Sequence, residues 1–391
     1  MNSFSTLHDN YEHHFAKSNP NMLKSMFGST DLMPLWIADM DFKVAEPITA
    51  ELKRLVDRGV YAYEFNTDEV FKAISDWNLK RHQLKLNSTS FLQVSSVLTG
   101  IALLIRELSN EGDGVVVQTP VYHQFYKVIT TANRKIVRNP LKIVDGNYVM
   151  DFDDLEVKLK SENVRIILLC NPHNPIGRVW NRQELQKLIE LANANNVTII
   201  SDEIHSDIIY SKAVFNSITS FNQKQHIAVL GSPAKTFGMQ SISNGYLYIA
   251  NEDMFNRIKA MVASMYLDHG NAFSAFATIA AYTKGEAWVD DLIVYIEHTI
   301  DWIQGFLQKE IPQVKLSRPE GTYQVWLDFS KLNISEDALQ KLIFKKAKLA
   351  LAPGTWFDKD HSQFMRMNIA SPISKIQEAF CQLKIAIDEG A

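Results

Sequence analysis

Three short apolar segments in the middle of the chain each stop at a polar stretch. The residues beyond their ends include an amide, a carboxylate and an amine. Apolar runs of this length, bounded by polar residues, are typical of strands buried on both faces of a sheet. The segments are 166–170, 199–201 and 227–230, and the polar residues that follow them are Asn174, Asp202 and Lys235.

The sequence between the first two segments has the period of an amphipathic helix. Its apolar positions are Leu185, Leu188, Ile189 and Ala192. Strand, helix and strand in this order predict a βαβ unit and therefore a parallel sheet. Ligands of such sheets bind beyond the carboxyl ends of the strands. We therefore expect the polar residues that follow the three strands to share one site.

The chemistry of these residues indicates a cofactor. A lone lysine after a strand is most often a solvated loop residue, but partial desolvation of Lys235 would lower its pKa and free the amine as a nucleophile. Asn174 and Asp202 favour that second interpretation. An amide for a ring hydroxyl, a carboxylate for a pyridinium nitrogen and a lysine for an aldehyde are the set that holds pyridoxal 5′-phosphate.

The motifs around these residues resemble those of a known superfamily. Asn-Pro-His-Asn-Pro-Ile-Gly at 171–177, Ser-Asp-Glu-Ile-His at 201–205 and Ser-Pro-Ala-Lys-Thr-Phe at 232–237 resemble the fold-type-I pyridoxal phosphate enzymes, the aspartate aminotransferase superfamily. Within it, Leu-Trp-Ile-Ala-Asp-Met-Asp-Phe at 35–42 and Asp-Glu-Ile-His at 202–205 resemble the MalY/PatB branch of cystathionine β-lyases and C–S lyases. The resemblance runs from about residue 30 to the C-terminus.

This resemblance implies an α/β fold: a mostly parallel seven-stranded sheet with helices on both faces, plus a smaller α+β domain. A chain of 391 residues is also long enough to divide into two domains. We expect an N-terminal arm and part of the small domain at 1–46, a large cofactor-binding domain at 47–286 and a C-terminal small domain at 287–391. Residues 1–33 read as an irregular polar arm over the surface or over a second subunit.

The resemblance also suggests how the cofactor is held. Ser96 precedes an apolar helix and is first of all an N-cap, but the free amides of Val97 and Leu98 at such a helix start suit a phosphate. Relatives place the cofactor phosphate there, usually with glycine at the position of Ser96, and Ser232 would add a hydroxyl. Tyr122 matches the tyrosine that stacks on the ring.

One further phosphate contact is expected from a neighbouring subunit. Relatives use a tyrosine in the stretch Gly59-Val60-Tyr61-Ala62-Tyr63, where Tyr63 matches best and Tyr61 is the rival. A core tyrosine would look the same in the sequence. Because sites of this family borrow residues across a two-fold interface, the resemblance implies a homodimer.

The substrate is expected to bind through its carboxylate. Arg366 lies in an apolar, strand-like run, and a buried arginine needs a partner such as a carboxylate. A structural ion pair is the alternative, but relatives use this arginine, with the backbone near Ala38, for the α-carboxylate of an amino acid. His205 stands where typical aminotransferases have a tyrosine on the ring hydroxyl, and whether it contacts the ring or packs nearby stays open.

Composition sets limits on partners and location. A net charge of −4 gives no reason to expect nucleic acid or an acidic membrane as a partner. The first 18 residues lack the apolar core of a signal peptide, and no apolar run is long enough to cross a bilayer. With two cysteines and no metal-ligand pattern, we expect a cytoplasmic protein without a metal.

These motifs indicate the cofactor more strongly than the reaction. In the family reaction the freed Lys235 amine removes the Cα proton. A thiolate on Cβ then leaves, giving pyruvate, ammonia and a thiol, or the cofactor is reprotonated and the amino group is transferred. Residues 36–42 and His205 favour a cystathionine β-lyase type of C–S β-lyase over a class I/II aminotransferase. A non-catalytic regulatory relative is disfavoured because no helix-turn-helix segment is attached and the lysine, carboxylate and amide are all present.

Overall fold

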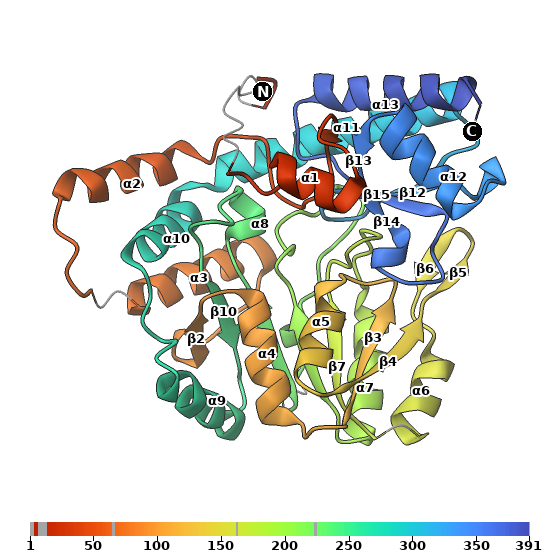
Figure 1. The fold of residues 1–391 in the computed structure, drawn as a ribbon. Helices are drawn as coiled ribbons and strands as arrows, with labels where there is room; N and C mark the ends of the chain where they lie inside the picture. The colour runs from red at the N-terminus through yellow and green to blue at the C-terminus, as the bar shows by residue number, and fades with distance from the viewer. Residues whose placement is uncertain (1–3, 7–13, 65–66, 162, 223–224, 391) are drawn as a thin grey trace.

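The computed structural model describes residues 4–6, 14–64, 67–161, 163–222 and 225–390. Its centre is a seven-stranded sheet (Figure 1). All the strands run parallel except β10, which is antiparallel to both of its neighbours. The mostly parallel seven-stranded sheet expected from the sequence is thus confirmed. In spatial order the strands are β2 (Phe91–Val94), β10 (Gly245–Tyr248), β9 (Ile227–Gly231), β8 (Thr198–Asp202), β7 (Val164–Cys170), β3 (Gly114–Thr119) and β4 (Lys135–Pro140).

Helices cover both faces of this sheet because successive strand residues point to opposite sides. In β7, Ile166 and Leu168 join one apolar cluster, and Ile167 and Leu169 join the other. The first cluster is covered by α4 (Val97–Leu108), α5 (Gln124–Thr131) and α9 (Glu252–Ser264). The second is covered by α3 (Thr67–His82), α6 (Phe152–Ser161), α7 (Arg182–Ala194) and α10 (Ala272–Lys284).

A smaller antiparallel sheet lies beyond the carboxyl ends of the parallel strands, at the top of Figure 1. Its strands are β11 (Lys315–Ser317), β12 (Gln324–Asp328), β15 (Phe364–Asn368) and β14 (Ala352–Pro353). Together with the helices around it, this sheet has an apolar cluster of its own. The helices are α11 (Glu286–Glu310), α12 (Glu336–Lys341), which continues as a π-helical turn (Leu342–Lys346), and α13 (Ile373–Asp388).

The N-terminal segment packs on this smaller unit. Strand β1 (Met33–Pro34) pairs in parallel with β13 (Leu349–Ala350), and α2 (Glu46–Arg58) then crosses to the large sheet, where it packs on α10. A separate hairpin joins β5 (Lys142–Val144) and β6 (Asn147–Val149). In the part of the chain that the structure describes, no helix has the length and apolar character of a membrane span.

The expectation that residues 1–33 are irregular is wrong for α1 (Pro20–Phe27). Asn19 accepts hydrogen bonds from the amides of Asn21 and Met22, and Gly28 ends the helix with a φ of 78°. Two apolar side chains, Leu23 and Phe27, are buried beneath it. Asparagine before proline at the start and glycine after the end are ordinary helix limits, so the signal was present in the sequence. Residues 1–3 and 7–13 lie outside the described residues.

The packing of α7 predicts the cost of disturbing the βαβ unit. Leu188 is fully buried on α7, against the sheet. We expect Leu188→Ala to lower the free energy of unfolding by about 2–5 kcal/mol, because the lost side chain leaves a cavity. Urea denaturation measures the change. Gln183→Ala, at an exposed position of the same helix, is the matched control and should stay within about 0.5 kcal/mol of the unmodified chain. Equal effects of the two changes would contradict this account of the packing.

Candidate active site

A cavity of about 510 Å³ lies at the carboxyl ends of β7 and β8, beneath the smaller sheet. It is lined by segments that are far apart in the sequence, from α1 and the stretch after β1 to β15. All the predicted site residues except Ser232 and Tyr63 line it. They are Ala38, Ser96, Val97, Leu98, Tyr122, Asn174, Asp202, His205, Lys235 and Arg366.

Lys235 lies on α8 (Ala234–Phe237), a single helical turn that follows β9. Its Nζ donates a hydrogen bond to the carbonyl oxygen of Ala38. Desolvation lowers the pKa of the amine to about 8, although the nearby carboxylate of Asp39 opposes the shift. Near neutral pH a useful fraction of this amine is therefore unprotonated, as a nucleophile or a general base requires.

Asp202 ends β8, where its carboxylate is 5% exposed. The backbone N–H of Ile204 donates to Oδ1 at 3.1 Å, and no ion pair involves this carboxylate among the described residues. Burial raises the pKa of Asp202 to about 6, against the opposing effects of the Ile204 hydrogen bond and of Lys235. A buried acid in this state would gain from a cationic or N–H-bearing ligand beside it.

Arg366 projects from β15 toward the large sheet. Its Nη1 donates to Asn174 Oδ1 at 3.1 Å and its Nη2 to the carbonyl oxygen of Trp36 at 2.5 Å. Burial lowers the pKa of the guanidinium to about 10, so it stays cationic at neutral pH. Within the described residues, Nε has no hydrogen-bond partner and no carboxylate pairs with the guanidinium. The structural ion pair considered for Arg366 is therefore not formed by these residues, and N–H groups remain for a bound carboxylate.

The rings in the cavity are neutral. Burial, reinforced by Lys235 and Arg366, lowers the pKa of His205 to about 3. The imidazole of His205 meets the ring of Tyr323 edge to face at 5.7 Å, and its Nδ1 has no partner among the described residues. Burial also raises the pKa of Tyr122, which keeps its hydroxyl protonated.

The start of α4 contributes backbone N–H groups to the cavity. The side chain of Ser96 caps this helix by accepting from the amide of Thr99 at 3.1 Å. Val97 and Leu98 belong to the first turn, where amides have no acceptor within the helix. Gly245 lets β10 pack closely against the start of α4, because a Cβ at this position would lie 2.8 Å from the carbonyl carbon of Ser96.

Two predicted residues are placed elsewhere. Ser232 does not line the cavity, because its hydroxyl donates to the carbonyl of Asn244 at 2.8 Å and accepts from the amide of Ala234 at 3.2 Å. Tyr63 is 93% exposed and lies beside a different hollow, with Phe91 and His269. A single chain therefore does not bring Tyr63 to the cavity.

Several lining residues were missed by the sequence analysis. His123 follows the predicted Tyr122, and its ring lies 5.9 Å from that of Trp356. Burial and Arg366 lower its pKa to about 4. Gln240 and Met22 also line the cavity. In the sequence, His123 was indicated only by its neighbour Tyr122. Met22 was not indicated, because it lines the cavity through the tertiary packing of α1.

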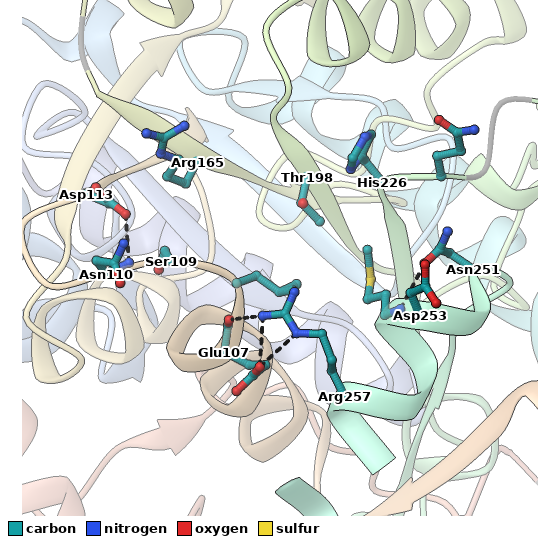
Figure 2. Close-up of a pocket in the computed structure, with 13 residues that line it drawn as sticks. Glu107, Ser109, Asn110, Asp113, Arg165, Thr198, His226, Asn251, Asp253 and Arg257 are labelled. Atoms are coloured by element: carbon teal, nitrogen blue, oxygen red, sulfur yellow. Dashed lines mark hydrogen bonds and ion pairs between the residues drawn. The ribbon is translucent and has the colours of Figure 1, made fainter. Parts of the chain in front are cut away.

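A second cavity, of about 560 Å³, lies at the opposite end of the sheet (Figure 2). In this cavity Arg257 Nη2 lies 2.8 Å from Glu107 Oε1, and Asp113 accepts from the backbone amide of Asn110 at 2.7 Å. The described residues also contain no group of His, Cys, Asp and Glu side chains suited to a metal ion. The first cavity, by contrast, brings together the lysine, carboxylate, amide and arginine that the sequence predicts for one site.

Comparisons with known proteins identify the family of this chain. Residues 30–382 match the family described as aminotransferase class I and II. The chain is 37% identical over 364 residues to cystathionine beta-lyase PatB of Bacillus subtilis (strain 168), covering 93% of this chain and 94% of the relative. It is 32% identical over 363 residues to protein MalY of Escherichia coli (strain K12), covering 92% and 93%.

A solved structure shows the same fold. Cystalysin from Treponema denticola, whose crystal structure contains a pyridoxal 5′-phosphate cofactor, superimposes with a TM-score of 0.92 and 29% identity. The match covers 99% of this chain and 98% of that one. Family, relatives and fold agree over nearly the whole length, and the chain therefore belongs to the class I and II aminotransferase family.

Proposed function

We propose that this chain binds pyridoxal 5′-phosphate in the first cavity and is a C–S β-lyase of the cystathionine β-lyase type. It would cleave cysteine thioethers to pyruvate, ammonia and a thiol. The observation that carries the proposal is the meeting of Lys235, Asp202 and Arg366 in one cavity. The identity of 37% to cystathionine beta-lyase PatB supports the reaction type.

The residues of the cavity fit this cofactor. Asp202, buried and free of an ion pair among the described residues, suits a protonated ring nitrogen. Asn174 suits the ring hydroxyl, and the flat face of Tyr122 suits the ring. The free amides of Val97 and Leu98 suit the phosphate. Ser232 would act there only indirectly, by fixing the turn into α8 through its bond to the amide of Ala234.

When bound, the cofactor supplies an aldehyde for the amino group of the substrate and a ring that withdraws electrons from Cα. The chain's own residues then act on the substrate. Arg366 holds the carboxylate with its remaining N–H groups, as charge-assisted hydrogen bonds favour. The Lys235 amine takes the proton from Cα as general base, which its lowered pKa permits. The carbonyl of Ala38 keeps that amine directed toward the cavity.

The direction of the next step separates the two candidate reactions. Loss of a thiolate from Cβ of the substrate would make the reaction an elimination, whereas transfer of the amino group to the bound cofactor would be the first half of an aminotransferase reaction. The similarity to cystathionine beta-lyase PatB favours elimination. Amino-group transfer is the second candidate, because the chain belongs to the aminotransferase family. In the sequence, His205 and residues 36–42 also favour the lyase over the aminotransferase. A non-catalytic regulatory role is the third candidate.

The assembly and location are parts of the same proposal. We infer a homodimer in which Tyr63 serves the cavity of the neighbouring subunit, since its own chain leaves it 93% exposed. Cys170 and Cys381 are both free thiols, which supports a cytoplasmic location. The partner of the enzyme would be a small amino-acid substrate.

The reaction itself gives the first test. We expect the purified protein to release pyruvate and thiol from L-cystathionine without an added 2-oxo acid, because elimination needs no amino acceptor. Coupled assays of pyruvate and thiol measure the two products. Strict dependence on a 2-oxo acid would overturn the lyase in favour of the aminotransferase, and a protein that holds no cofactor and turns over nothing would favour the regulatory role.

The second test concerns Lys235. We expect Lys235→Ala to abolish covalent attachment of the cofactor after borohydride reduction, because no other lysine lines the cavity among the described residues. Elimination should also slow by at least about 100-fold through loss of the general base. Mass spectrometry of the reduced protein measures the attachment, with Lys187→Ala, on the outer face of α7, as the control. Cofactor still trapped in Lys235→Ala would mean that the wrong lysine had been identified.

The third test is the pH dependence of the same amine. Without cofactor, the pKa of Lys235 is lowered to about 8 by desolvation. The amine should therefore become reactive as the pH rises through about 8, whereas exposed lysines follow at about 10.4. Reductive methylation at a series of pH values, read by mass spectrometry of the peptide containing residue 235, measures the midpoint. A midpoint equal to that of the exposed lysines would contradict the desolvated environment.

A further inference from the structure

Behind the cavity lies a buried carboxylate on which three donors converge. The indole Nε1 of Trp77 donates to Asp207 Oδ1 at 2.8 Å, and His82 Nε2 lies 2.9 Å from the same oxygen. The hydroxyl of Thr236 donates to the other oxygen, Oδ2, at 2.7 Å. The side chains come from three separate elements, since Trp77 and His82 lie on α3, Asp207 follows β8, and Thr236 lies on α8.

Asp207 is ionised in this setting. Burial by itself would raise the pKa of the carboxyl, which is 5% exposed, but the hydrogen bonds from His82, Thr236 and Trp77 outweigh burial and lower it. An ionised carboxylate accepts hydrogen bonds and donates none. The Thr236 hydroxyl therefore has a fixed direction, with its proton toward Oδ2.

The helix that carries Thr236 also carries Lys235, and it is weak by itself. α8 has four residues, follows Pro233, whose side chain gives no cap, and is ended by Gly238, whose φ is 71°. So short a helix has little intrinsic stability. Side-chain contacts therefore help to fix its orientation, and Thr236 provides one of them, a hydrogen bond to an ionised carboxylate.

Neighbouring positions on a helix differ by about 100° around its axis. Once the side chain of Thr236 points at Asp207, the Cα–Cβ bond of Lys235 is directed toward the cavity. The branched Cβ of Thr236 makes this coupling stiff, because few χ1 rotamers are available to it.

We propose that Asp207 and Thr236 are positioning residues, which hold α8 at the rotation that places the Lys235 amine in the cavity. This inference rests on the proposed function of Lys235. Neither residue lines the cavity, so neither is expected to touch the substrate or the cofactor. Their effect should appear in the chemistry of the amine more than in substrate affinity.

Thr236→Val tests the proposal, because it keeps the shape of the side chain and removes only the donor. We expect kcat to fall by about 10- to 100-fold with a smaller change in KM, since a misplaced base slows the proton transfer itself. The rate of borohydride-trapped attachment of added pyridoxal phosphate should fall in parallel. Thr236→Ser keeps the hydroxyl and should restore most of both rates.

The matched control is Thr299→Val, on α11. Thr299 is fully buried and its hydroxyl donates to the carbonyl of Tyr295 at 3.0 Å, so this variant loses one buried hydrogen bond that involves no residue of α8. It should keep the unmodified rates. If Thr236→Val and Thr299→Val have equal rates, or if Thr236→Ser does not restore them, the proposal is wrong. Should Thr236→Val not fold, the rates of Asp207→Asn are compared with those of Thr299→Val instead, because Asp207→Asn keeps the size of the side chain and removes its charge.

Amide hydrogen exchange on the chain without cofactor separates this inference from the proposed function. The amides of Phe237 and Met239, bonded to the carbonyls of Pro233 and Ala234 at 3.0 and 3.1 Å, should exchange faster in Thr236→Val than in Thr299→Val. If the unmodified chain takes up no pyridoxal phosphate, the proposed function fails while the exchange still tests the anchoring of α8. Unchanged exchange in Thr236→Val, or faster exchange with unchanged attachment, would overturn the positioning role.

Discussion

Parallel pairing of three adjacent strands is the constraint on which the site depends. Cys170 of β7 pairs with Asp202 of β8, and Asp202 pairs with Leu230 of β9, so the three strands end in one row. Within the sheet, backbone N–H and C=O groups are hydrogen-bonded to neighbouring strands. The polar side chains lie where this pairing stops. The amide, the carboxylate and the lysine are therefore neighbours because the register makes them so.

The stretch between Trp36 and Asp41 closes the cavity and joins its two sides. The side-chain amide of Asn368 donates to the carbonyls of Ile37 and Asp39, both at 2.6 Å, which fixes the stretch to β15. The carbonyl of Ala38, between them, accepts from Lys235 and from the hydroxyl of Tyr323. One peptide group thus connects the amine of the large sheet with the small sheet that carries Arg366.

A buried charge network holds the far end of this stretch. Lys17 lies 2.6 Å from Asp39 and 2.5 Å from Asp41, and Lys375 of α13 lies 2.9 Å from Asp41. Removing one partner would leave uncompensated charge in a buried place, which is strongly destabilising. The N-terminal segment is in this way part of the frame of the cavity, although its polar sequence suggested a loose arm.

The sequence was most informative where local pattern and fold agree. Strand ends, the period of α7 and the apolar setting of Arg366 depend on neighbours in the chain, and each led to the observed sheet and cavity. Contacts that depend on tertiary packing could not be read in this way. Ser232 had a suitable hydroxyl, but the carbonyl of Asn244 lies within its reach. Met22 and His123 reach the cavity only because α1 and the segment after β3 fold over it.

The reversed direction of β10 has a consequence for how this protein can vary. The segment from Ser232 to Asn244, which carries Lys235, leaves the sheet at β9 and returns to the same edge at β10, with Gly231 paired to Tyr246. β10 is clamped on its other side by β2, where Gly245 pairs with Val94. A shift of β9 or β10 by one residue would move every side chain of that strand to the opposite face of the sheet. Sliding of β9 or β10 therefore cannot accommodate an insertion or deletion in this connection. We expect its length to be tightly constrained, and the identity of its exposed residues to be less so.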